Sequence, residues 1–113
     1  MADYSNIDVF HGAAYTVNGY VRGKNITGWS IEFIVRASED TSSSALITKT
    51  VGSGITIVNP TAVGGGTYTI ALSATNTSLT EGQYYFSIAR TDSGVEGLIA
   101  YGLFNVSSST TLG

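Results

Sequence analysis

Residues 29–36 decide the fold class, because apolar and polar side chains alternate along them. The stretch reads Trp29-Ser30-Ile31-Glu32-Phe33-Ile34-Val35-Arg36. Successive side chains of a β-strand point to opposite faces, so every second residue of this stretch shares one face. That face would carry Trp29, Ile31, Phe33 and Val35. The stretch therefore predicts a strand with one side in a hydrophobic core.

Seven further short stretches continue this pattern along the chain. They cover residues 7–10, 14–17, 46–50, 55–58, 67–72, 83–88 and 98–106. Glycine-rich and polar turn signals separate them, among them Asn18-Gly19 after residues 14–17 and Gly64-Gly65-Gly66 before residues 67–72. About eight short strands with turn signals roughly every 8–12 residues are typical of a sandwich or small barrel. We predict an all-β antiparallel sandwich.

Composition limits the possible functions. The 113 residues suit a single domain, which we place at 1–106 with a flexible Ser/Thr tail at 107–113. Charged residues make up only 12% of the chain, about half the usual share, so we expect some apolar surface to be hidden by a partner. The absence of cysteine excludes disulfides and thiolate metal sites. Five Lys and Arg without a cluster argue against nucleic-acid binding.

Targeting signals are absent from the amino-terminal residues, which lack the positive flank and apolar run of a signal peptide. No apolar stretch approaches the ~20 residues needed to cross a bilayer. We expect a soluble protein that is made in the cytoplasm and has no membrane partner.

Residues that could act in catalysis or bind a metal are few, and none is accompanied by the other residues that such a site needs. His11 is the only histidine and no nucleophile motif accompanies it, so we predict no catalytic residue and no enzyme activity. Glu39-Asp40 and Asp92 lie in predicted turns without calcium-loop spacing. The Gly64-Gly65-Gly66 run lacks the Gly-Lys-Ser/Thr ending of a phosphate loop. We predict no metal and no cofactor.

One segment resembles a known corner motif. Residues Leu79-Thr80-Glu81-Gly82-Gln83-Tyr84-Tyr85-Phe86 are similar to the Gly-x-Tyr-x-Cys corner of immunoglobulin-like domains, with Phe86 at the cysteine position. Trp29 opens a strand upstream, as the core tryptophan of such domains does. The resemblance implies an immunoglobulin-like antiparallel β-sandwich of about eight strands. It also implies that Tyr84 packs its ring inside while its hydroxyl bonds nearby backbone.

A wider resemblance covers most of the chain. It is carried by Gly28-Trp29-Ser30-Ile31-Glu32-Phe33, Gly54-Ile55-Thr56-Ile57, Thr67-Tyr68-Thr69-Ile70, Leu79-x-x-Gly82-x-Tyr84 and Tyr101-Gly102-x-Phe104-x-Val106. In this order the motifs resemble the immunoglobulin-like amino-terminal domain of phage baseplate upper proteins and of head and tail decoration proteins. The resemblance implies a structural virion protein whose partners are major capsid, tail or baseplate proteins. Because no second domain follows, we expect a stand-alone accessory or capsid-cementing protein.

The last predicted strand is apolar on both faces. One face would carry Leu98, Ala100, Gly102, Phe104 and Val106, and the other Ile99, Tyr101 and Leu103. A sheet face that meets water normally reads polar. In the immunoglobulin arrangement, two neighbouring strands belong to the same sheet and add their own outward apolar residues. The predicted interface consists of Ile34, Tyr85, Ile99, Tyr101 and Leu103. The predicted core consists of Trp29, Ile31, Phe33, Val35, Ile70, Tyr84, Phe86, Ile88, Phe104 and Val106.

Hiding this surface would be favourable. At ~25 cal/mol per Å², covering ~500 Å² is worth on the order of 12 kcal/mol before association costs. We therefore expect assembly with other virion proteins and with further copies as a homo-oligomer. Two alternatives stay open at this point. The chain's own amino-terminal segment or tail could cover the patch, or the domain could be a carbohydrate- or receptor-binding module that uses loop aromatics such as Tyr20.

Overall fold

Eight β-strands and no helix make up the computed structural model, which describes residues 3–38 and 44–107. The strands are β1 (Asp3–Phe10), β2 (Tyr15–Arg22), β3 (Ile31–Arg36), β4 (Ala45–Val51), β5 (Gly54–Asn59), β6 (Gly65–Leu72), β7 (Gly82–Arg90) and β8 (Gly97–Ser107). The prediction of an all-β fold is confirmed. None of the described segments is a helix that could cross a membrane.

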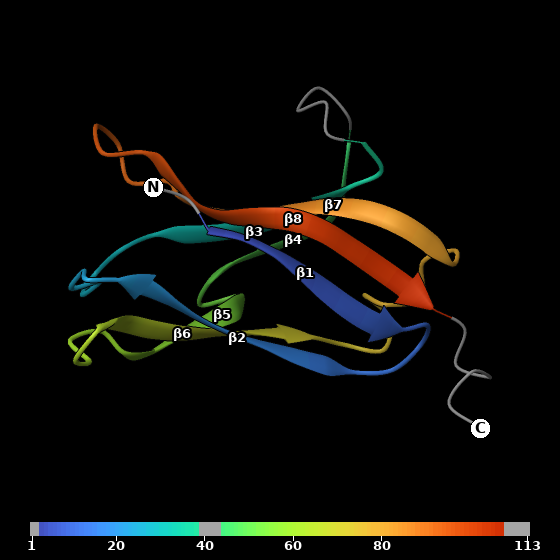
Figure 1. The fold of residues 1–113 in the computed structure, drawn as a ribbon, viewed down its shortest axis with the longest axis horizontal. Coiled ribbons are helices and arrows are strands. Elements are labelled where there is room, and N and C mark those ends of the chain that lie inside the picture. The colour runs from blue at the N-terminus through green and yellow to red at the C-terminus, as the bar shows by residue number, and fades with distance from the viewer. Residues whose placement is uncertain (1–2, 39–43, 108–113) are drawn as a thin grey trace.

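The strands form one continuous sheet in the order β1-β8-β7-β3-β4-β5-β6-β2, which folds over on itself. The sheet turns over between β4 and β5, where only two residue pairs, Thr50–Gly54 and Val51–Ile55, are in register. Figure 1 shows the result as two facing layers. We call β1, β8, β7, β3 and β4 the upper sheet and β5, β6 and β2 the lower sheet. Since β1 and β2 end the strand order, the arrangement is a sandwich with one joined corner.

The strand order is that of an immunoglobulin-like domain. The sheet of an immunoglobulin fold that carries strands C, F and G corresponds to β3, β7 and β8, with β4 added beside β3. The facing sheet with strands B, E and D corresponds to β2, β6 and β5. The first strand, β1, pairs in parallel with β8 and extends the upper sheet. The predicted immunoglobulin-like sandwich is therefore the observed fold.

The core fills the space between the two sheets. Phe33 lies at its centre, with its ring 6.0 Å from that of Phe86 and 6.3 Å from that of Phe104. Of the predicted core residues, Ile31, Phe33, Val35, Ile70, Phe86, Ile88, Phe104 and Val106 are buried. The other two, Trp29 and Tyr84, are partly buried and pack against the margin of this cluster.

The corner before β7 has the geometry that the resemblance implied. The hydroxyl of Tyr84 donates a hydrogen bond of 2.5 Å to the carbonyl of Thr80. Phe86, at the cysteine position, is buried against Phe33. Trp29 differs from the expectation, because β3 begins only at Ile31. A turn in which the Trp29 amide donates to the Ile26 carbonyl holds Trp29 in the preceding loop.

Two further boundaries differ from the sequence predictions. Asn18-Gly19 was expected to form a turn, yet both residues lie within β2, with Gly19 opposite Tyr68 on β6. A Cβ atom at position 19 would lie 2.5 Å from the Tyr68 ring, so the glycine makes room for the aromatic side chain. Ser107 was placed in the tail but is the last residue of β8. Residues 108–113 of the predicted tail lie outside the described residues.

Candidate functional site

The outer face of the upper sheet carries an apolar surface built from four adjacent strands. On β7 and β8, Tyr85 lies opposite Leu103, and Tyr101 lies between Ser87 on β7 and Tyr4 on β1. Ile34 on β3 faces the same way, because its neighbours Phe33 and Val35 point into the core. We call this surface the outer patch. Its members are Tyr4, Ile34, Tyr85, Leu98, Tyr101 and Leu103.

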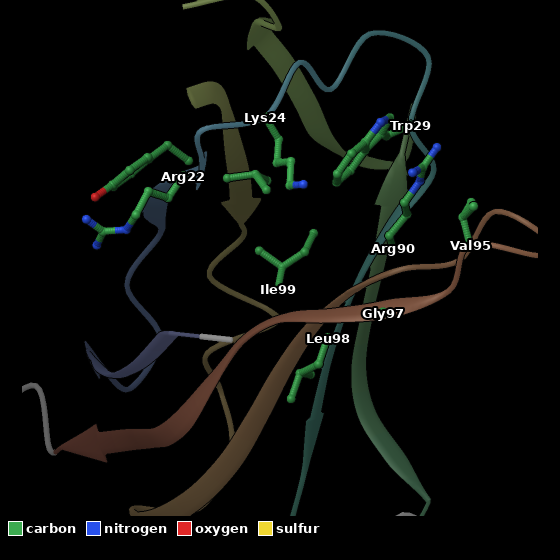
Figure 2. A pocket seen from close by; sticks show the side chains of 10 residues that line it. Arg22, Lys24, Trp29, Arg90, Val95, Gly97, Leu98 and Ile99 are labelled. Atoms are coloured by element: carbon green, nitrogen blue, oxygen red, sulfur yellow. The ribbon is translucent and has the colours of Figure 1, made fainter. Parts of the chain in front are cut away.

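The prediction that Ile99 belongs to this face is wrong, and so is the prediction that Leu98 faces the core. Ile99 is buried with 9% exposure, whereas Leu98 is 49% exposed. The cause is a β-bulge: Ala100 pairs with Ile88 and Leu98 pairs with Ala89, which leaves Ile99 as an extra residue in β8. The bulge reverses the alternation at this point. Figure 2 shows the side chains of Leu98 and Ile99 on opposite sides of the strand.

A shallow groove of about 330 Å³ runs across the outer patch. Its walls include Tyr4, Leu98 and Tyr101, which are 59%, 49% and 42% exposed. The rings of Tyr4 and Tyr101 meet edge to face, with centroids 5.3 Å apart. Arg36, Ser38 and Ser87 add polar atoms to the groove lining. The site thus combines exposed aromatic surface with a polar margin, which is the usual composition of a protein–protein contact.

The described part of the amino-terminal segment does not cover this face. From Asp3 onward it forms β1, which lies beside β8 as the edge strand, with Asp3 opposite Ala100. The approach is close, since a Cβ atom at Gly102 would lie 1.6 Å from the carbonyl oxygen of Ser5. β1 therefore widens the outer patch by adding Tyr4. Sequence reasoning missed this contribution because Asp3, Ser5 and Asn6 are poor strand formers.

The remaining candidates from the sequence are dispersed. His11 is exposed, and its Nδ1 lies 2.8 Å from the carbonyl oxygen of Leu79. Asp92 accepts hydrogen bonds from the Arg90 Nε at 2.8 Å and the Ser30 amide at 2.9 Å. Both bonds lower the pKa of Asp92 below its ordinary value of 3.8, and the bond from Arg90 has the larger effect. Glu39-Asp40 lies outside the described residues.

Among the described residues no group of three or more His, Asp and Glu side chains could hold a metal ion. Gly64-Gly65-Gly66 spans the turn into β6, where the Gly64 carbonyl accepts from the Gly23 amide. The glycine run thus joins the β2–β3 loop to the β5–β6 turn.

Comparison with known proteins adds little to this description. No protein-family model and no curated protein matches the chain. Among solved structures, one similar chain comes from a study of multimeric cell-adhesive interactions of VGSC beta subunits. The TM-score is 0.45 with 14% sequence identity, over 94% of this chain and 93% of that one. A likeness at this level does not bear on function.

Proposed function

We propose that this domain is a structural protein of a phage virion that acts by assembly, and that its outer patch packs against the same patch of a second copy. The observation that carries the proposal is the exposure of Tyr4, Leu98 and Tyr101 together on one sheet face. Monomeric proteins rarely leave large contiguous apolar surfaces in water. The virion setting is supported by the resemblance of the sequence motifs to phage decoration and baseplate domains.

The area available is enough for a modest interface. A Tyr or Leu that is about half exposed leaves roughly 100 Å² in water, so these three residues alone leave roughly 300 Å². Two identical patches in contact would hide about twice that area. At ~25 cal/mol per Å² the gain is about 15 kcal/mol, against association costs of about 4–15 kcal/mol. The balance favours a weak to moderately stable pair that a virion lattice would reinforce by repetition.

A second copy is the occupant that the composition of the patch favours. None of its six members is charged, so two identical patches can meet without repulsion between like charges. A two-fold contact needs only one self-complementary surface, and such contacts are the commonest in soluble oligomers. The net charge of −3 on each copy is small enough for screening at physiological salt.

The test is to replace Tyr101 and Leu103 together with Ser and to measure mass in solution by sedimentation. The wild-type protein should form dimers or larger species at about 100 μM, and Tyr101→Ser/Leu103→Ser should remain monomeric. Both changes lie on the outer face, so far-UV circular dichroism and the unfolding midpoint should stay close to those of the wild type.

A matched control comes from the lower sheet. Val58 on β5 is also 59% exposed but faces away from the outer patch, so Val58→Ser should leave self-association unchanged. A wild-type protein that is monomeric at 100 μM contradicts packing between copies. If that monomer still binds purified particles through Tyr101 and Leu103, the occupant is a coat protein and the second copy is ruled out.

A further inference from the structure

A second concavity, of about 200 Å³, opens at one end of the sandwich, and we call it the end pocket. It lies where β2 and β7 end and where β8 begins. Its polar walls are Tyr20, Arg22, Lys24, Trp29 and Arg90. The buried Ile99 contributes to its apolar lining, so the β-bulge that turns Leu98 toward the outer patch also turns Ile99 toward this pocket. Figure 2 shows Ile99 beneath Lys24, with Trp29 and Arg90 at one side.

Positive charge is concentrated in the end pocket. Three of the chain's five Lys and Arg residues line it, and no carboxylate of the described residues does. Two acids belong to the adjoining β7–β8 loop. Asp92 is bonded to Arg90 and Ser30, and Glu96 accepts from the Gly94 amide at 3.1 Å. Across residues 3–38 and 44–107 the Arg90–Asp92 pair is the only ion pair, so Arg22 and Lys24 have no acidic partner there.

Contacts with the protein hold the two guanidinium groups, and hydrogen bonds hold the backbone of Lys24. The Arg90 guanidinium lies 4.0 Å from the Trp29 ring centroid while its Nε bonds Asp92. Arg22 lies 5.7 Å from the centroid of Tyr20. Lys24 extends from a fixed turn, because its amide donates to the Val21 carbonyl and its carbonyl accepts from the Gly66 amide. Groups that are ordered before a ligand arrives lose less entropy on binding.

The size and walls of the pocket limit what it could take. A volume of 200 Å³ is below the ~300–1,000 Å³ of sites for drug-sized ligands, so it would admit one ring or one side chain. Unpartnered cations call for an anion, and the Tyr20 ring with the aliphatic floor calls for a ring with apolar faces. A neutral sugar would leave the cations unused. A bare inorganic anion would leave the aromatic and aliphatic walls unused.

We propose that the end pocket binds a single acidic sugar residue, with its carboxylate facing Arg22 and Lys24 and its ring against Tyr20. This proposal is independent of assembly through the outer patch, since it rests on different residues. The two concavities share only Leu98, which lines both. A domain with both properties would attach to its own kind by one face and to an acidic glycan by one end.

The experiment is a titration of ¹⁵N-labelled protein followed by amide chemical shifts. The probes are glucuronate and N-acetylneuraminate, with glucose and acetate as comparisons. The acidic sugars should shift the amides of residues 20–24, 29–31 and 90–99 with a Kd in the millimolar range, as expected for one small ligand. Glucose and acetate should bind at least about tenfold more weakly, because each engages only half of the site.

Lys24→Gln is the decisive variant, since Lys24 is exposed and its substitution spares the fold. Losing one charge-assisted contact should weaken binding of the acidic sugars about tenfold. Lys49→Gln, which removes the same charge from β4 outside the pocket, should leave it unchanged.

Four outcomes would overturn the proposal. Acetate binding as tightly as glucuronate would mean an adventitious anion site, and equal binding of glucose would mean that the cations play no part. Unchanged affinity in Lys24→Gln would place the ligand elsewhere. Saturation by a glutamate-rich peptide without response to either sugar would assign the pocket to a protein partner. None of these results depends on whether the protein self-associates.

Discussion

The two outer faces of this sandwich are made from the same kind of strand and differ sharply in chemistry. The outward positions of the lower sheet are Thr16, Asn18, Tyr20, Thr56, Val58, Thr67, Thr69 and Ala71. The corresponding positions of the upper sheet carry the outer patch. Both sheets bury their inner faces in one core, so the difference is not required by folding.

The outward positions of the lower sheet have the composition expected of a face in contact with water. Threonine suits a strand because its β-branch packs well on a pleated surface, and its hydroxyl remains satisfied by solvent. The exposed apolar residues of this face, Tyr20 on β2 and Val58 on β5, are separated by Thr67 on β6, and isolated apolar residues are normal on any surface. The outer patch lacks this compromise, because tyrosine and leucine gather on adjacent strands. A clean alternation therefore marks a wet face, and its loss over several paired strands marks a face that is meant for contact.

The largest expected effect concerns which of two neighbours belongs to the outer face. Ile99→Ala should lower the free energy of unfolding by about 2–4 kcal/mol, because Ile99 is buried and its truncation leaves a cavity. Leu98→Ala should change it by no more than about 0.5 kcal/mol, because the Leu98 side chain is half in water. Urea denaturation at low protein concentration measures both.

The same pair of variants separates stability from assembly. Leu98→Ala should weaken self-association at high concentration, whereas Ile99→Ala should do so only where it unfolds the protein. A larger loss of stability in Leu98→Ala than in Ile99→Ala would mean that β8 has no bulge at Ile99. The alternation would then run unbroken, and the outer patch would lose Leu98 and regain Ile99.

The sequence was sufficient for the fold where local rules agree. The alternation of residues 31–36 and the corner around Tyr84 each predict one arrangement, and β3 and β7 have it. The rules failed where contact with a neighbouring strand determines which residue a position requires. Gly19 reads as a turn residue, but the Tyr68 ring across from it needs the missing Cβ. Such a requirement is visible only when the pairing of β2 with β6 is known.

The candidate site was predictable to a similar extent. Ile34, Tyr85, Tyr101 and Leu103 lie on the predicted face. The two remaining members were missed for a shared reason, since both depend on pairing to β8. The bulge at Ile99 turns Leu98 outward, and the parallel pairing of β1 brings Tyr4 beside Tyr101. A period of two assigns faces reliably only until the first extra residue in a strand.

Two adjacent tyrosines provide a more modest test of the difference between inner and outer faces. Tyr84→Phe removes the hydrogen bond to the Thr80 carbonyl and should cost about 1 kcal/mol of stability. Tyr85→Phe is the matched control, because the Tyr85 hydroxyl makes no hydrogen bond within the described part of the chain and faces outward. It should cost no more than about 0.5 kcal/mol. Equal effects on the urea midpoint would show that the hydrogen bond of Tyr84 does not determine which residues of β7 face the core.

The smallest expected effect is a pH dependence at the margin of the upper sheet. The hydrogen bond from Arg90, followed by that from the Ser30 amide, lowers the pKa of Asp92. The unfolded chain, with its ordinary pKa of 3.8, therefore takes up the proton at higher pH than the folded protein does. The resulting stability is present above about pH 4 and is lost as the pH falls through the lower, folded pKa.

Asp92→Asn should accordingly shrink the drop in the urea midpoint between pH 7 and pH 3. The other carboxylates are common to both proteins, so the difference between the two drops isolates Asp92. An identical drop in wild type and variant would mean that the Arg90–Asp92 bond does not persist in solution. The Arg90 guanidinium would then be held only by its contact with the Trp29 ring.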